Sequence, residues 1–239
     1  MHTFYNKTVF ITGASRGIGK ALALELAASG AKLGLMARNE AELLDVQSAV
    51  RSAGTDCLIA CGDVGDEAFT DSSVRSFLDQ YGHVDILINN AGYGIFKPAE
   101  EFTFAEWDGL MSTNLKGTFL MCKAAIPHMK QRKSGHIINI ASDVAKRTFP
   151  CGSLYCASKY AQDAFSSALR KELRAFGIKV SVVYSGLVDS YFHAEPQGDV
   201  SHRDWLTNED MARSISFIAA QPPHMVIDEL MIHPLAQEY

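Results

Sequence analysis

The sequence predicts an α/β fold in which a mainly parallel, seven-stranded sheet is doubly wound, with helices on both faces. Short apolar segments alternate with longer amphipathic segments almost to the end of the chain, and the short segments are apolar throughout rather than at every second residue. Strands that alternate with helices form parallel sheets, and strands buried on both faces are continuously apolar. Because no internal repeat or Pro/Gly-rich linker interrupts the chain, we expect one domain over residues 1–239.

The first half of the chain begins with a strand and a helix. Residues 7–12 are rich in β-branched side chains, which favour strands. In residues 17–29, Ile18, Leu22 and Leu26 recur at helical spacing. By the same criteria we expect strands at 31–37, 56–61 and 84–89, and helices at 40–53 and 66–81.

The second half continues the alternation. The expected elements are two helices between residues 104 and 133, a strand at 136–140, a helix at 154–176, a strand at 179–184, a helix at 211–220 and a strand at 228–232. The connection over residues 185–208 is irregular and polar. Connections of this length in a compact domain are usually functional, so we predict a substrate lid there.

Composition and charge exclude several classes of protein. Hydrophobic residues make up 47% of the chain and charged residues 21%, which is typical of a folded domain. The formal net charge of −5 disfavours a nucleic-acid binder or a polybasic membrane binder. The sequence begins with no basic segment followed by a long apolar one, so we expect no signal peptide and a cytoplasmic protein.

The cysteines and histidines indicate neither a disulfide framework nor a metal site. The chain has 5 cysteines and no C-x-x-C pair, which fits free thiols in a reducing compartment. His193 and His202 lie in the 185–208 segment without a carboxylate or cysteine at ligand spacing. We therefore expect no metal.

A glycine-rich turn joins the first expected strand to the first helix. Its sequence is Thr12-Gly13-Ala14-Ser15-Arg16-Gly17-Ile18-Gly19. Glycines permit a tight turn and close backbone approach, and a helix N-terminus attracts a pyrophosphate. The spacing differs from the common G-x-G-x-x-G fingerprint and from a Walker loop. A nucleotide site is favoured, and a turn that binds nothing is the alternative.

The residue after the second strand indicates which dinucleotide binds. An NAD site normally places an acidic residue there for the ribose 2′-hydroxyl, whereas this chain has Arg38. A guanidinium forms charge-assisted hydrogen bonds with phosphate, so Arg38 favours the 2′-phosphate of NADP, and Arg16 adds a second positive group. The alternative for Arg38 is a solvated residue at the start of the next helix.

A tyrosine and a lysine share one face of the long helix. Tyr155 and Lys159 are four residues apart, and Ser142 follows the fifth strand. A nearby ammonium group would lower the phenol pKa toward working pH, giving a general acid/base, and a serine hydroxyl could donate to a carbonyl oxygen. Alone, a Tyr-x-x-x-Lys pair is common on helix surfaces.

Taken together, the motifs resemble the short-chain dehydrogenase/reductase family. The glycine turn, Asn89-Asn90-Ala91-Gly92, Asn114, Ser142 and the Tyr155/Lys159 pair occur in the family's order and spacing, over essentially the whole chain. The resemblance implies a Rossmann fold and, through Arg16 and Arg38, the NADP-preferring branch. It also implies a small-molecule carbonyl or secondary alcohol as substrate.

The resemblance implies a role for each matching residue. Tyr155 is the implied acid/base, Lys159 lowers its pKa and holds the nicotinamide ribose, and Ser142 orients the carbonyl. Asn114 is implied to hold a water in a proton relay. Asp63, next to Val64, is implied to contact adenine. The remaining implied cofactor contacts are Gly13, Ser15, Arg16, Gly17, Ile18, Gly19, Arg38, Asn90, Ala91, Gly92, Val188 and Ser190.

The chain departs from the family after the sixth strand, where Pro-Gly-x-Val-x-Thr is usual. Here the segment is Ser185-Gly186-Leu187-Val188-Asp189-Ser190. Loss of the proline frees a φ angle and adds a backbone donor, which puts the rigidity of this loop in doubt.

We expect the choice of substrate to be determined by residues 143–153, residues 93–96 and the lid at 185–208. Lys146 and Arg147 suggest an anionic substrate, but solvation or a contact with a neighbouring subunit is the favoured explanation. An apolar substrate wall is suggested by four residues that are equally plausible as core: Phe149, Leu187, Phe192 and Trp205.

The leading interpretation is an NADP-dependent carbonyl reductase or alcohol dehydrogenase. The alternatives are a dedicated 3-oxoacyl, 3-hydroxy acid or sugar reductase, and a non-catalytic NADP-binding regulator on the same fold. Resemblance of the helices at 104–133 and 154–176 to the family's dimer interface implies a homodimer, or a homotetramer completed by the last strand.

Overall fold

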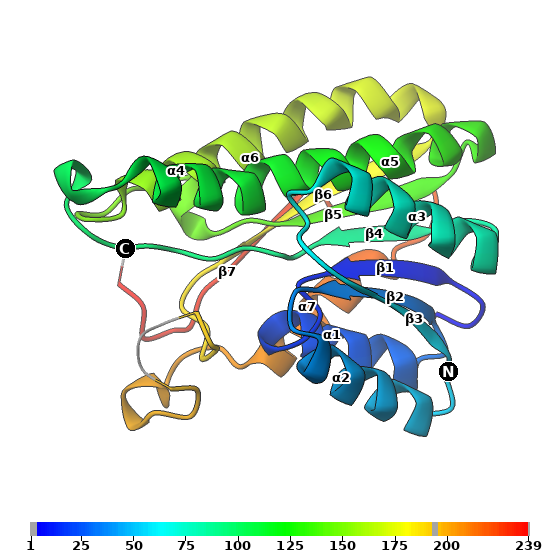
Figure 1. The fold of residues 1–239 in the computed structure, drawn as a ribbon, viewed down its shortest axis with the longest axis horizontal. Helices are drawn as coiled ribbons and strands as arrows, with labels where there is room; N and C mark the ends of the chain where they lie inside the picture. Colours follow the sequence, from blue (N-terminus) through cyan, green and yellow to red (C-terminus); the bar gives the residue numbers. More distant parts are fainter. Residues whose placement is uncertain (1–3, 193–195, 239) are drawn as a thin grey trace.

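The computed structural model describes residues 4–192 and 196–238, and a parallel sheet of seven strands forms its centre (Figure 1). The strands are β1 (Thr8–Thr12), β2 (Lys32–Ala37), β3 (Cys57–Cys61), β4 (Ile86–Asn89), β5 (Gly135–Ile140), β6 (Ile178–Ser185) and β7 (Glu229–Ile232). Their order is β3-β2-β1-β4-β5-β6-β7, and every neighbouring pair is parallel. The predicted doubly wound α/β fold is confirmed.

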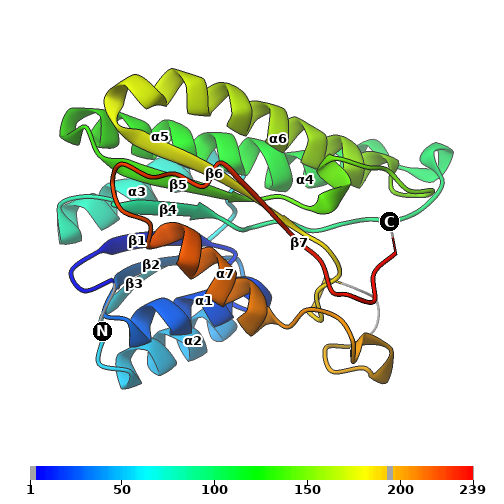
Figure 2. The ribbon, with the colours of Figure 1, turned by 180° about the vertical axis from the view of Figure 1, so that it is seen from behind.

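Helices cover both faces of the sheet, and each layer has its own apolar core. The helices are α1 (Gly17–Ala28), α2 (Glu40–Ser52), α3 (Glu67–Tyr81), α4 (Phe104–Met111), α5 (Gly117–Arg132), α6 (Ser153–Leu173) and α7 (Asn208–Ala219). Figure 2 shows α1, α2 and α7 on one face and α3 to α6 on the other. Leu22, Leu33 and Ile215 belong to the first core, and Phe10 and Phe77 to the second.

The order of the strands determines where a ligand can bind. Because β1 lies between β2 and β4, the direction of winding reverses there, and open sheets bind ligands at such a point, beyond the carboxyl ends of the strands. Thr8, at the start of β1, and Asp85, just before β4, fix the alignment of these two strands. The Asp85 carboxylate accepts from Thr8 N at 3.0 Å, and Thr8 Oγ1 accepts from Asp85 N at 3.0 Å.

The boundaries differ from the sequence-based expectations mainly at helix ends. The helix expected from residue 211 begins at Asn208, because Thr207 and Asp210 form a reciprocal capping box. The two helices expected between residues 104 and 133 are α4 and α5, joined by a π-helical turn at Ser112–Lys116. The helix expected to reach residue 176 ends at Leu173 and continues as a 3₁₀ turn.

The segment expected to be irregular, residues 185–208, is held at several points. Val188 pairs with Leu206 in an isolated β-bridge. The Asp189 carboxylate accepts from Gly198 N at 3.0 Å and lies 3.0 Å from His202 Nδ1. His193 lies outside the described residues. None of the helices in the described parts of the chain is long and apolar enough to span a bilayer.

We predict that Gly34→Ala destabilises the fold. A Cβ at residue 34 would lie 2.6 Å from Phe77 Cδ2 and 2.8 Å from Phe10 Cδ2, two rings in the core. Overpacking of this kind costs roughly 1–3 kcal/mol. Urea unfolding measures the change, and an unaltered midpoint would show that the rings move aside freely.

Candidate active site

A cavity of about 900 Å³ opens at the carboxyl edge of the sheet. It is lined by the loops that follow β1, β2, β3, β4, β5 and β6. Of the predicted site residues, the structure brings these to the cavity wall: Gly13, Ser15, Arg16, Gly17, Ile18, Arg38, Asp63, Val64, Asn90, Ala91, Gly92, Ser142, Tyr155, Lys159, Val188 and Ser190. Gly19 and Asn114 lie behind this wall.

The glycine turn has a shape that side chains would block. Gly13 adopts a φ of +66° and Gly17 a φ of +55°, both in the left-handed region. A Cβ on Gly13 would lie 2.9 Å from Ala91 Cα, and one on Gly19 would lie 2.1 Å from Gly13 O. The turn therefore brings its backbone close to the loop after β4 and to the start of α1, as a cradle for phosphate requires.

Asn90 holds the glycine turn in place. Its Nδ2 donates to Thr12 O at 3.0 Å and to Gly13 O at 3.1 Å. In return, Thr12 Oγ1 accepts from Asn90 N and Ala91 N, each at 3.1 Å. Two loops that are distant in sequence thus form one rigid floor of the cavity.

Two arginines face the part of the cavity next to the glycine turn. Arg16 is the residue before α1, and its guanidinium carbon lies 5.4 Å from the centre of the Tyr191 ring. Arg38 follows β2. Asp63 also lines the cavity, and its Oδ1 accepts from Gly65 N at 2.8 Å. The two guanidinium groups fit a dinucleotide that carries an additional phosphate.

Ser142 and Tyr155 are buried at the inner end of the cavity. Ser142 is the second residue after β5, and its Oγ lies within hydrogen-bond distance of Asp143 Oδ1 at 3.1 Å and Ser185 O at 3.3 Å. Tyr155 is in the first turn of α6 and is 7% exposed. Burial raises the pKa of the Tyr155 phenol, and the hydrogen bond with Ser142 opposes this effect.

Lys159 lies one turn further along α6, and its amine points away from solvent. Nζ donates to Ile140 O at 2.9 Å and to Gln162 Oε1 at 3.1 Å, and it lies 5.9 Å from the centre of the Tyr155 ring. Burial lowers the pKa of Lys159 to about 7. Burial therefore dominates both groups: it raises the pKa of Tyr155 and lowers that of Lys159, and the lowering of the Tyr155 pKa by Lys159 stays a prediction.

A chain of buried hydrogen bonds connects Lys159 to Asn114. Gln162 Nε2 donates to Thr118 Oγ1 at 3.0 Å, and Thr118 Oγ1 donates to Asn114 O at 3.1 Å. Asn114 lies in the π-helical turn, and its Nδ2 donates to Ser158 Oγ at 3.0 Å. Gln162 and Thr118 were not predicted as site residues, although Gln162 is three residues after Lys159 and so lies on the same helix face.

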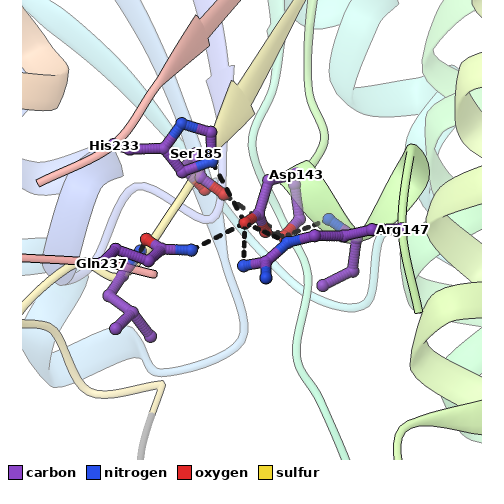
Figure 3. Close-up of polar contacts among 8 residues, drawn as sticks. Asp143, Arg147, Ser185, His233 and Gln237 are labelled. Carbon is purple, nitrogen blue, oxygen red and sulfur yellow. Dashed lines mark hydrogen bonds and ion pairs between the residues drawn. The ribbon is translucent and has the colours of Figure 1, made fainter. Parts of the chain in front are cut away.

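The carboxylate of Asp143 contacts side chains from two distant parts of the chain (Figure 3). Asp143 is 4% exposed, and its Oδ2 accepts from Arg147 Nε at 2.9 Å and from Gln237 Nε2 at 2.8 Å. His233 Nε2 lies 3.2 Å from the same oxygen. Gln237 Oε1 accepts from Leu187 N at 2.8 Å, which holds the loop that lacks the family's proline. None of these partners of Asp143 was predicted as such.

The residues considered for substrate recognition separate into two groups. Arg147, Phe149, Leu187 and Phe192 line the cavity, together with Phe96 from the predicted substrate segment at residues 93–96. Lys146 instead pairs with Asp163 at 2.9 Å and Glu229 at 3.5 Å. Trp205 stacks on His202, with ring centres 3.9 Å apart.

Solved structures with the same architecture belong to oxidoreductases. An alcohol dehydrogenase from the archaeon Thermococcus sibiricus, complexed with 5-hydroxy-NADP, superposes with a TM-score of 0.92 at 29% identity, covering 98% of both chains. A metagenomic short-chain oxidoreductase in complex with NADP has a TM-score of 0.87 at 31% identity, covering 98% of this chain and all of that one (100%).

Sequence comparison agrees with the structural one. An uncharacterized oxidoreductase from Staphylococcus epidermidis is 31% identical over 229 residues, which is 96% of this chain and 97% of the relative. The family model for short chain dehydrogenase matches residues 7–199. The chain therefore belongs to the short-chain dehydrogenase family of oxidoreductases, as its motifs predict.

Proposed function

We propose that the protein is an NADP(H)-dependent oxidoreductase that interconverts a small-molecule carbonyl compound and the corresponding secondary alcohol. One observation carries the proposal: Ser142, Tyr155 and Lys159 line the same cavity as the glycine turn. A nucleotide site alone would fit a non-catalytic NADP-binding regulator equally well. A buried phenol, hydroxyl and amine at one end of that site support catalysis.

The residues around the glycine turn fit the proposed cofactor. The backbone at Gly13, Ser15 and Gly17 is open to a pyrophosphate, and Arg16 and Arg38 supply positive charge for a 2′-phosphate. Asp63, Val64 and Asn90 to Gly92 would hold the adenine side, and Val188 and Ser190 the nicotinamide side. The NADP bound in structural relatives supports the same choice. When bound, the nicotinamide supplies or accepts the hydride.

Tyr155 is the proposed acid/base. Because burial raises its pKa, the phenol keeps its proton at neutral pH, which is the form that donates to a carbonyl oxygen during reduction. Ser142 Oγ has one proton, now directed toward Asp143 or Ser185, and it could turn to the same carbonyl oxygen. The two hydroxyls would then orient the carbonyl from one side.

Lys159 is the proposed source of the replacement proton. A pKa of about 7 places the amine between its two charge states at neutral pH, so it can pass a proton to a tyrosinate and regain one. Gln162 and Thr118 connect the amine to the Asn114 carbonyl, where the family's relay water is expected.

We also propose the organisation of the whole chain. Residues 1–239 would form one domain with residues 185–208 as a substrate lid, in a cytoplasmic homodimer or homotetramer. Exposed aromatic side chains on α4 and α5 support self-association: Trp107 is 48% exposed and Phe119 46% exposed.

Tyr155→Phe should abolish turnover and leave NADPH binding intact, because only the transferable proton is removed. Loss of a general acid lowers kcat roughly 10²- to 10⁴-fold. NADPH oxidation and calorimetric binding measure the two effects. Tyr160→Phe, a matched change at an exposed position of the same helix, should keep wild-type turnover. Equal turnover in the two variants would contradict the role of Tyr155.

Arg38→Asp should shift the cofactor preference from NADP toward NAD. The substitution replaces the proposed partner of the 2′-phosphate with a group that repels phosphate and accepts from a ribose hydroxyl. We expect the ratio of kcat/KM for NADPH over NADH to fall roughly 10- to 100-fold, as loss of a charge-assisted hydrogen bond implies. Arg51→Asp, on an exposed part of α2, is the control. An unchanged ratio in Arg38→Asp would remove this residue from the cofactor site.

The stability of the cofactor-free protein should depend on Lys159 and pH. The folded pKa of about 7 lies below the ordinary lysine pKa of 10.5, so between these two pH values the unfolded chain holds the extra proton. The free energy of unfolding therefore rises as the pH rises through that range. Below pH 7 the buried amine is charged, and its desolvation destabilises the folded state fully. In urea unfolding from pH 6 to 9, the free energy of unfolding of the wild type should rise relative to that of Lys159→Met. Parallel curves would show that the amine is not desolvated.

A further inference from the structure

Three phenylalanine rings surround the catalytic end of the cavity. We call Phe96, Phe149 and Phe192 the phenylalanine wall. The Phe96 ring meets Tyr155 edge-on, with centres 5.6 Å apart and an interplanar angle of 89°. The Phe192 ring lies 5.3 Å from Tyr155, and Phe149 lies 5.6 Å from Phe96. A group attached to a carbonyl carbon near the Tyr155 hydroxyl would therefore meet aromatic faces and edges.

Two glycines, Gly94 and Gly152, leave space for the phenylalanine wall. A Cβ on Gly94 would lie 2.6 Å from Phe96 Cζ and 2.9 Å from Phe192 Cζ. A Cβ on Gly152 would lie 2.4 Å from Phe149 Cζ. The rings thus pack directly onto glycine backbone, and larger residues at these two positions would push them into the cavity or away from it.

The two loops that carry Phe96 and Phe149 are joined. Lys97 N donates to Cys151 O at 2.9 Å, and Lys97 Nζ pairs with Glu106 at 2.7 Å. Cys151 has a φ of +64°, a left-handed conformation that is unfavourable for a residue with a Cβ. The hydrogen bond from Lys97 to Cys151 therefore ties the loop that carries Phe96 to the loop that carries Phe149.

The wall leaves much apolar surface uncovered. Phe96 is 43% exposed and Phe149 39% exposed, although both line the cavity. Rings that pack in a core lose nearly all of this surface, as Phe77 does at 0% exposed. Covering the wall with an apolar ligand group would release water from it and add edge or face contacts.

The arginine beside the wall is already paired. Arg147 lines the cavity, but its guanidinium binds the buried carboxylate of Asp143, which also accepts from Gln237 (Figure 3). Asp143 lines the cavity too, so the pair contributes no net charge there. An anionic substrate would have to compete with Asp143 for Arg147 and would face the charge of that carboxylate.

We propose that the substrate is a neutral carbonyl compound with an aromatic ring next to the carbonyl carbon, and that the ring binds against the phenylalanine wall. This inference rests on the proposed oxidoreductase function of the same cavity. It makes Phe96, Phe149 and Phe192 specificity-determining residues, with Asp143 acting through Arg147 against anions.

The test compares matched carbonyl compounds in NADPH oxidation by the full-length protein. Methyl benzoylformate is neutral and aromatic, benzoylformate is its anion, and methyl pyruvate lacks the ring. We expect kcat/KM for methyl benzoylformate to exceed each of the others roughly 10-fold or more, within the range that pocket contacts provide. Equal or lower values for methyl benzoylformate would overturn the inference while leaving the oxidoreductase function standing.

Variants of the wall show where the preference arises. Phe96→Leu and Phe192→Leu should lower the ratio of kcat/KM for methyl benzoylformate over methyl pyruvate, chiefly through KM. Phe217→Leu, at an exposed site on α7, should keep the wild-type ratio. A ratio that is the same in all variants would overturn the role of the wall.

Ligand binding separates failure of this inference from failure of the proposed function. Binding of acetophenone to the NADP-loaded protein can be followed by saturation-transfer NMR. If acetophenone binds to the wild type and binds more weakly to Phe96→Leu, the inference about the wall is supported. If, in addition, no carbonyl compound is turned over, only the proposed oxidoreductase function is contradicted. Absence of binding would overturn the inference.

Discussion

The amide of Asn90 joins two strand ends on which the rest of the site depends. It holds Thr12 and Gly13 from the end of β1 against the loop after β4, where the sheet reverses its direction of winding. Because those two strands are adjacent, their loops diverge to opposite sides and leave a cavity between them. The phosphate-facing backbone of the glycine turn takes its position from this contact.

The fold could be predicted almost completely from the sequence, since continuously apolar strands between amphipathic helices leave few alternatives. The ends of elements were less certain because they depend on local hydrogen bonds. The capping box of Thr207 and Asp210 starts α7 earlier than its apolar pattern does. The π-helical turn between α4 and α5 has no signal in hydrophobic periodicity, because it keeps the chain helical.

The site residues also separate into those that could be predicted from the sequence and those that could not. Residues in short motifs, such as the glycine turn and the Tyr155/Lys159 pair, were found because their spacing along the chain determines their geometry. The partners of Asp143 were not, because His233 and Gln237 come from the far end of the chain and reach it only through the tertiary fold. Burial also raises the Tyr155 pKa, and the degree of desolvation is a property of the folded molecule.

The contacts of Asp143 tie the end of the chain to the catalytic end of the cavity. Its carboxylate meets His233 across 90 positions of sequence and Gln237 across 94, and both follow β7, the last strand. Contacts between such distant positions require long loops to close. The surroundings of Ser142 are therefore complete only when β7, at the edge of the sheet, is in place. The last strand thus contributes to the catalytic end of the cavity through the residues that follow it.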